Sequence, residues 1–352
     1  MFEFKNTKTY KEQILTLFVF IIRIKNIAMH SLDHLKSLID KEIKDLGLKI
    51  DPKDLYDPVS YILHMGGKRI RPLLTLLSCD MFGGNVTDAI KPALGMEMFH
   101  NFTLIHDDIM DNAEIRRGKD TVHKKWNGNQ AILSGDAMLI LANQMMLQVE
   151  NKLVREVMDL YNECGLKVCE GQQYDMNYEK TENISLNDYL KMIELKTAVL
   201  LAGCLRLGAV IAKTDNNNKE LIEQFGINLG ISFQIEDDLL DAFGDADTFG
   251  KKIGGDIIIN KKTFLLVKAM ELADHSQLTE IKYWLNKENI QHEEKIKNII
   301  RIYSNLQIEK IALETSKYYF DEAMKYLDQT DVDHLKKIRL KEYVNGFFNR
   351  NI

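Results

Sequence analysis

The sequence contains few of the residues that mark most non-helical protein classes. Its 352 residues include only four prolines and four cysteines, with no CxxC pair and no His/Cys spacing typical of zinc sites. Few prolines favour long helices over a turn-rich β protein. No β-strand pattern, internal repeat or low-complexity segment is recognisable. We therefore expect one all-α domain whose cysteines are buried, reduced thiols.

Neither sign of charge dominates the chain. Forty-six basic residues stand against 52 acidic ones, which gives a net charge of −6. An overall basic field, the usual mark of a nucleic-acid-binding protein, is absent, so we expect no nucleic-acid partner.

A long apolar segment is also missing. The run 14–22 (ILTLFVFII) is shorter than the roughly 20 residues that a membrane-spanning helix needs. No small-residue cleavage site follows it, which argues against a secretory signal. We interpret residues 1–28 as a dispensable extension and residues 29–352 as the functional domain. We expect a cytoplasmic protein without stable membrane insertion.

Three carboxylates interrupt the apolar segment 100–118 (HNFTLIHDDIMDNAEIRRG). On a helix, Asp107 and Asp111 share one face and Asp108 lies beside them. Like charges so close destabilise a helix unless a cation compensates. Clustered oxygen ligands suit Mg²⁺, which substrate phosphates commonly help to coordinate. The cluster therefore predicts a metal-bridged phosphate site, although a single such motif is also common on solvated helix faces.

A second copy of the motif favours the metal site. Asp237, Asp238 and Asp241 repeat the spacing in the apolar segment GISFQIEDDLLDAFGD, 130 residues downstream. Two acidic triads in apolar segments are poorly explained by solubility. They predict two helices that face each other across a cavity.

Basic residues accompany these motifs. Arg116 and Arg117 suit bidentate phosphate binding. In MGGKRIRPLL, Lys68 and Arg71 lie directly before an apolar helix that opens at Pro72, where an anion site forms readily, but a charged loop without a ligand has the same pattern. Lys196, in a mostly apolar helix, requires either a diphosphate or a neighbouring carboxylate as partner.

The motifs GGKRIRP, LIHDDIMD…RRG, GQQYDM, KTA and FQIEDDLLD…GKKIGGD…KKT occur in one order. In these residues the chain, from about Leu35 to Phe347, resembles the trans-isoprenyl diphosphate synthases, or polyprenyl synthetases, of the short-chain farnesyl and geranylgeranyl type. The resemblance implies a single large antiparallel helical bundle around a deep central cavity (the isoprenoid synthase type I fold) and a homodimer.

The resemblance also implies roles for individual residues. About three Mg²⁺ ions would bind the allylic diphosphate. Their protein ligands would be Asp107, Asp108, Asp111 and Asp237, supported by Asp238 and Asp241. The allylic diphosphate is further bound by Arg116, Lys196, Lys251, Lys261 and Gln234, and Thr197 helps to stabilise the cation. The diphosphate of isopentenyl diphosphate is bound by Lys68, Arg71, His100 and Arg117.

The implied reaction is a Mg²⁺-dependent head-to-tail condensation of isopentenyl diphosphate with an allylic diphosphate. By analogy, Phe102, five residues before the first aspartate, limits the product to about fifteen to twenty carbons. A helical wheel places Phe99, His100 and Thr103 closer to the aspartate face than Phe102. The alternatives are a longer-chain synthase, a terpene cyclase and a non-catalytic partner subunit; cyclases usually alter the second triad, and partner subunits usually lose aspartates.

Overall fold

The computed structural model describes residues 29–48, 50–244, 254–287 and 291–348. The amino-terminal half contains α2 (Leu32–Asp45), α3 (Lys53–Leu63), α4 (Ile70–Met81), α5 (Val86–Met110), β1 (Ile115–Arg116), β2 (Lys119–Asp120), α6 (Val122–Lys125), α7 (Gly128–Met146), η1 (Asn151–Leu153) and α8 (Val154–Glu179). The remainder contains α9 (Leu186–Ile193), η2 (Glu194–Ala198), α10 (Val199–Ile211), α11 (Asn216–Phe243), α13 (Gly255–Ile258), α14 (Phe264–Leu272), α15 (His275–Asn286), α16 (His292–Asn305), α17 (Ile308–Gln329) and α18 (His334–Phe348).

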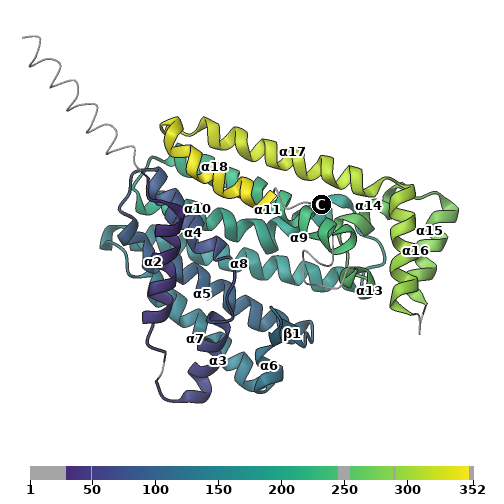
Figure 1. Cartoon of the computed structure of the whole chain (residues 1–352), viewed down its shortest axis with the longest axis horizontal. Coiled ribbons are helices and arrows are strands. Elements are labelled where there is room, and N and C mark those ends of the chain that lie inside the picture. The colour runs from purple at the N-terminus through teal and green to yellow at the C-terminus, as the bar shows by residue number, and fades with distance from the viewer. Residues whose placement is uncertain (1–28, 49, 245–253, 288–290, 349–352) are drawn as a thin grey trace, which may run out of the picture.

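The helices form a bundle with α10 near its centre (Figure 1). Nearly every side chain of α10 is buried, as expected for a helix that is apolar on all sides. It packs against α4 and α11, while α17 runs along α11 and α7 along α5. The helices α15 and α16 stand across one end of the bundle. The predicted all-α architecture is confirmed.

The two aspartate-bearing helices are among the longest in the described part of the chain. α5 has 25 residues and begins at Asn85, whose side chain accepts a hydrogen bond from the Thr87 amide (3.2 Å). α11 has 28 residues and begins at Asp215, which accepts from the Asn218 amide (3.0 Å). Such caps satisfy free amides of the first turn. Both acidic motifs consequently lie at the carboxyl ends of long, well-capped helices.

A short β-hairpin, which the sequence pattern did not predict, follows the first motif. Ile115 pairs with Asp120 and Arg116 with Lys119. The two connecting residues, Arg117 and Gly118, have φ values of 52° and 73°. Positive φ at both central residues is the requirement of the tight hairpin turn that matches strand twist. Because the strands have two residues each, no alternating pattern could reveal them.

Cys79, Cys164 and Cys204 are buried and free, as predicted, but Cys169 is exposed, which corrects the expectation that all four are buried. Within the described residues, no helix by itself has the length and apolar character to cross a bilayer; only α7 together with 151–179, bent by 120°, passes that test.

Candidate active site

Lys261 lies electrostatically between the aspartate motifs of α5 and α11, and Lys196 lies beside the first motif. Lys196 acts on the charge of Asp107 and Asp111. Burial alone would lower the pKa of Lys261, but the carboxylates of Asp256, Asp238 and Asp175 raise it above its ordinary value. Lys261 also acts on Asp111. Carboxylates of both motifs, Asp111 and Asp238, are therefore close enough to Lys261 to interact with its charge.

The first motif divides its carboxylates between two environments. Asp108 is 1% exposed; the single N–H of Arg116 Nε is shared between its two carboxylate oxygens, both 2.9 Å away, and Arg116 Nη2 lies 2.7 Å from Oδ1. Burial raises the pKa of Asp107 to about 6, and burial likewise raises the pKa of Asp111. Asp108 thus anchors the hairpin arginine, and Asp107 and Asp111 are the members of the triad that would gain most from a cation.

Lys196 lies in the π-helical turn η2, where the regular helix is interrupted. Its Nζ is 2.5 Å from Asp175 Oδ2 on α8. The sequence left a diphosphate and a carboxylate open as partners, and this structure contains the carboxylate pair. An added Cβ at Gly171 would collide with the backbone of Lys196, so glycine allows α8 to approach η2 this closely. Such π turns occur frequently at functional sites.

A chain of hydrogen bonds runs from η2 to the second motif. Thr197 Oγ1 donates to Gln234 Oε1 (3.1 Å), and Gln234 Nε2 donates to Asp238 Oδ1 (3.1 Å). Asp238 Oδ2 accepts from the Tyr189 hydroxyl (2.6 Å) and the Phe264 amide (2.8 Å). Burial raises the pKa of Asp238 to about 6. Both carboxylate oxygens of Asp238 accept hydrogen bonds from the protein. Asp238 is therefore better suited to support the metal ligands than to be a principal ligand itself.

The other two acidic residues of α11 differ from Asp238. Asp241 Oδ2 accepts from the Asp256 amide (2.9 Å) and so fixes the start of α13. Asp237 is exposed. Of this triad, Asp237 is therefore the carboxylate that solvent or a ligand can reach most readily. Lys251 lies outside the described residues.

Around His100 the structure gathers the arginines of the GGKRIRP and RRG motifs. Burial, and then the charges of Arg71, Arg117, Arg116 and Arg69, hold the pKa of His100 well below its ordinary value. His100 is therefore neutral at physiological pH and can accept or donate a hydrogen bond. The cluster has the positive charge that a diphosphate requires.

The arginines of this cluster are used differently. Arg69 donates hydrogen bonds within the protein, to Glu97 Oε1 (2.7 Å) and to the Leu63 carbonyl. Arg117 donates to the Gly66 carbonyl. Arg71 Nε is buried and has no hydrogen-bond partner in the described part of the chain. Since an unpaired buried donor is costly, Arg71 is the member most suited to an incoming anion.

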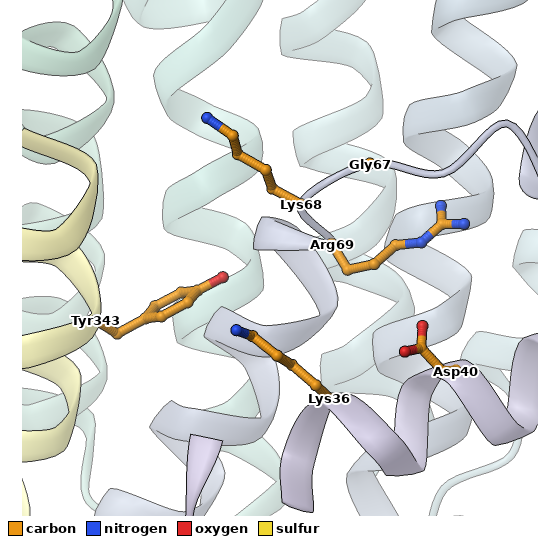
Figure 2. Close-up of a pocket in the computed structure, with 6 residues that line it drawn as sticks. All are labelled: Lys36, Asp40, Gly67, Lys68, Arg69 and Tyr343. Atoms are coloured by element: carbon orange, nitrogen blue, oxygen red, sulfur yellow. The ribbon is translucent and has the colours of Figure 1, made fainter. Parts of the chain in front are cut away.

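A cleft of about 310 Å³ opens beside this cluster (Figure 2). Its lining comprises Lys36, Asp40, Gly67, Lys68, Arg69 and Tyr343. In Figure 2 the amine of Lys36, from α2, and the hydroxyl of Tyr343, from α18, point toward each other, while the amine of Lys68 points away from both. Sequence reasoning did not select Lys36 or Tyr343, because both lie far along the chain from the motif and neither sits in a recognisable pattern.

The comparison with known proteins decides the family. Residues 52–303 match the sequence profile named "Polyprenyl synthetase". The chain belongs to the polyprenyl synthetase family. The geranylgeranyl diphosphate synthase of Sulfolobus acidocaldarius is 36% identical over 302 residues, which cover 84% of this chain and 88% of that protein. The geranylfarnesyl diphosphate synthase of Aeropyrum pernix is 36% identical over 251 residues, 69% of this chain and 79% of that protein.

A solved structure gives the same result for the fold. The crystal structure of a geranylgeranyl pyrophosphate synthase superposes with a TM-score of 0.88 at 42% identity, covering 92% of this chain and all of that one. The predicted family, fold class and enzyme class, a prenyltransferase, are confirmed. The roles of single residues remain predictions, supported by the geometry above.

The donor set of this polyprenyl synthetase fits Mg²⁺. Asp107, Asp111 and Asp237 offer only carboxylate oxygens, the ligands that Mg²⁺ prefers. The raised pKa of Asp107 and Asp111, caused first by burial, marks negative charge that the protein compensates incompletely. Within the described ranges no three acidic, His or Cys side chains converge closely enough to hold a metal by themselves. That geometry agrees with a cation whose coordination is completed by diphosphate oxygens and water.

The residues proposed to control product length lie on α5 before the motif. Phe99 is 3% exposed and packs against Tyr161 of α8, with ring centroids 5.6 Å apart. Phe102 contacts both Phe99 (5.6 Å) and His106 (4.8 Å). The Thr103 hydroxyl donates to the His100 carbonyl (2.8 Å). Phe99 and Phe102 thus form a layer of two touching rings, one to two turns before Asp107.

The charge of Asp107 predicts a pH-dependent stability. Burial raises its pKa from 3.8 to about 6, so the folded protein binds this proton more tightly than the unfolded chain. The stability contributed by Asp107 falls as the pH rises from about 4 to about 6, then stays low. Without divalent cations, Asp107→Asn should stabilise the protein by about 1–3 kcal/mol above pH 6, and by much less near pH 4.

Urea unfolding in EDTA, at a pH of about 4 and about 7.5, measures this difference. Asp88→Asn, an exposed change in the first turn of the same helix, serves as control and should show no comparable gain at either pH. An equal effect of Asp107→Asn at both pH values would contradict the raised pKa.

Proposed function

We propose that the enzyme condenses isopentenyl diphosphate head-to-tail with an allylic diphosphate, in a Mg²⁺-dependent reaction that gives an all-trans product of about fifteen to twenty carbons and free diphosphate. The observation that carries this proposal is the link between the two aspartate motifs: Lys261 acts on Asp111 and Asp238, and hydrogen bonds run from Thr197, beside Lys196, through Gln234 to Asp238. The names of the relatives in Sulfolobus and Aeropyrum support the substrate class and a short to medium product.

The first chemical step is ionisation of the allylic carbon–oxygen bond. Mg²⁺, when bound, neutralises charge on the leaving diphosphate. Lys196, Lys261 and Arg116 bind the same group and are fixed before the reaction, so little reorganisation is needed as negative charge develops. Lys196 pairs with Asp175, and Arg116 pairs with Asp108. The incoming diphosphate therefore either shares these two cations with the carboxylates or displaces the carboxylates from them.

The second step is attack by the double bond of isopentenyl diphosphate on the allylic cation, which forms the new carbon–carbon bond; the released diphosphate then accepts the proton that is lost. Lys68, Arg71, His100 and Arg117 hold the diphosphate of this substrate at the other basic cluster. The Thr197 hydroxyl and the carbonyl of Lys196 help to stabilise the cation. In a π turn the carbonyl register is shifted from that of an α-helix, which supports a carbonyl directed at the cavity.

A product assay tests the proposal. Purified full-length protein with Mg²⁺ receives labelled isopentenyl diphosphate and either dimethylallyl, geranyl or farnesyl diphosphate, and the dephosphorylated products are sized. We expect products that stop at about fifteen to twenty carbons and no product in EDTA. Products of about thirty carbons or more would overturn the short-chain assignment. A folded protein that elongates no primer would favour a cyclase or a partner subunit.

We also propose that the enzyme is a homodimer that pairs through α7 and α8. Leu133 and Ile140 of α7 recur with Leu147, the residue directly after this helix, every seven residues and are 50–61% exposed; Leu166 of α8 is 64% exposed. An apolar stripe of this kind usually marks an interface, and two-fold dimers are the commonest oligomers. Sedimentation should give twice the chain mass of 40.7 kDa, and Ile140→Asp should shift the protein toward monomer. A monomeric wild type would contradict this assignment.

A further inference from the structure

The backbone that carries Lys261 ends the short helix α13 in a defined capping motif. The Asn260 amide donates to the Ile257 carbonyl (3.3 Å), and the Lys261 amide donates to the Asp256 carbonyl (3.0 Å). Asn260 has a φ of 60°. These two bonds with a left-handed residue between them form a Schellman motif, where glycine is the usual choice. Lys261 therefore leaves the helix in a direction that Asn260 sets.

The side chain of Asn260 explains why glycine is not used at this position. Asn260 Nδ2 donates to the Leu285 carbonyl of α15 (2.9 Å), and Asn260 Oδ1 accepts from Lys295 Nζ of α16 (2.5 Å). Lys295 also donates to the Ile258 carbonyl (3.0 Å), one of the carbonyls left free at the end of α13. The turn before Lys261 is thus tied to both helices at this end of the bundle.

Lys295 belongs to neither basic cluster, and it is unusually buried for a lysine. It is 8% exposed, and lysine is rarely buried unless its amine is paired. Both identified acceptors of its amine belong to the turn before Lys261, and neither is a carboxylate. A neutral apolar side chain would pack there at lower desolvation cost. The hydrogen bonds that the amine donates to this turn therefore explain why a lysine occupies the position.

The position of Lys261 matters because several carboxylates converge on its amine. Nζ lies 3.5 Å from Asp256 Oδ1, and the charges of Asp238 and Asp175 also act on it. A displacement of about 1 Å at such a centre can cost a factor of about a hundred in rate.

We propose that Asn260 and Lys295 are a positioning pair that places Lys261 at the allylic diphosphate, although neither touches the substrate. This proposal rests on the function proposed above. Lys295 acts through the turn: it holds Asn260 and the end of α13, and the turn directs Lys261 between the aspartate motifs. The pair governs binding of the allylic substrate and leaves the isopentenyl diphosphate cluster unaffected.

The first test compares Lys295→Met with Lys297→Met, an exposed lysine on the same helix. Lys295→Met should raise KM for geranyl diphosphate, and the calorimetric Kd of Mg²⁺ with inorganic diphosphate, about tenfold. KM for isopentenyl diphosphate should change less than about twofold, and Lys297→Met should change none of these constants. Equal losses for both substrates would reduce Lys295 to a general structural role and overturn the proposal.

A double-mutant cycle establishes whether Lys295 acts through Lys261. In a Lys261→Met background, Lys295→Met should have almost no additional effect on the Kd of diphosphate, because the group it positions is gone. Full additivity would overturn the proposal. If Lys295→Met fails to fold, Asn260→Gly replaces it, since glycine keeps the left-handed turn but loses both anchoring bonds. A wild-type protein that binds diphosphate but makes no product would refute the proposed function while leaving the cycle interpretable.

Discussion

Replacing Asp107 with alanine should lower kcat/KM for prenyl transfer by about a thousandfold or more while leaving the fold intact. Asp107 is the member of its triad whose pKa burial raises to about 6, and Lys196 opposes that rise. The apo protein therefore holds this carboxylate at an energetic cost, and alanine should not destabilise it. The loss should come from the transition state, because the leaving diphosphate loses metal-borne positive charge.

Steady-state kinetics with geranyl diphosphate and thermal unfolding of the same samples measure the two effects. Asp88→Ala, an exposed aspartate in the first turn of the same helix, is the matched control and should keep near wild-type activity. Unchanged turnover by a folded Asp107→Ala protein would refute the metal role of Asp107. A variant that unfolds would instead show that this carboxylate stabilises the fold, contrary to its raised pKa.

Replacing Phe102 with alanine should lengthen the product by at least one isoprene unit. Its ring contacts Phe99 (5.6 Å) and His106 (4.8 Å), so truncation opens space one to two turns before Asp107 and also frees the Phe99 ring to move. A short-chain enzyme stops when the growing chain meets such a layer, because further growth would require overpacking. Chromatography of dephosphorylated products, at fixed substrate ratio, measures the shift.

Phe99→Ala is the comparison that separates the two rings. Phe99 is 3% exposed and packs on Tyr161 of α8, so its truncation should cost about 3–5 kcal/mol of stability. Phe102 is only partly buried, so Phe102→Ala should lower the stability by less. A product that lengthens with Phe99→Ala and stays unchanged with Phe102→Ala would transfer the chain-length role to Phe99, the residue that the helical wheel placed nearer the aspartate face.

The sequence predicted the fold class and the two acidic motifs because their signals are local. Carboxylates in apolar segments, repeated with one spacing, can be recognised without knowing which helices touch. The same holds for GGKRIRP and RRG, whose cations the structure gathers around His100. Lys196 was recognised as needing an anion for the same reason, and Asp175 of α8 supplies one here.

What the sequence could not predict depends on contacts between distant segments. Asn260 and Lys295 are 35 positions apart, and neither residue type suggests a buried bond between them. Lys36 and Tyr343 join the cleft beside Lys68 from the two ends of the described chain. The π turn at Lys196 depends on packing of η2 against α8. In each case tertiary packing selects among conformations that the local sequence also permits.

Under the proposed function, the hairpin after the first motif sets the separation of the two diphosphate sites. Arg116 is directed to Asp108 of α5, whereas its neighbour Arg117 is directed to the Gly66 carbonyl before α4. Adjacent residues thus contact different helices, so a single peptide unit separates the two proposed anion sites. Inserting one residue between them would lengthen the turn and move Arg117 relative to Arg116. A change in the Phe99–Phe102 layer, by contrast, leaves this spacing untouched, so product length can vary while the two diphosphates stay at one separation.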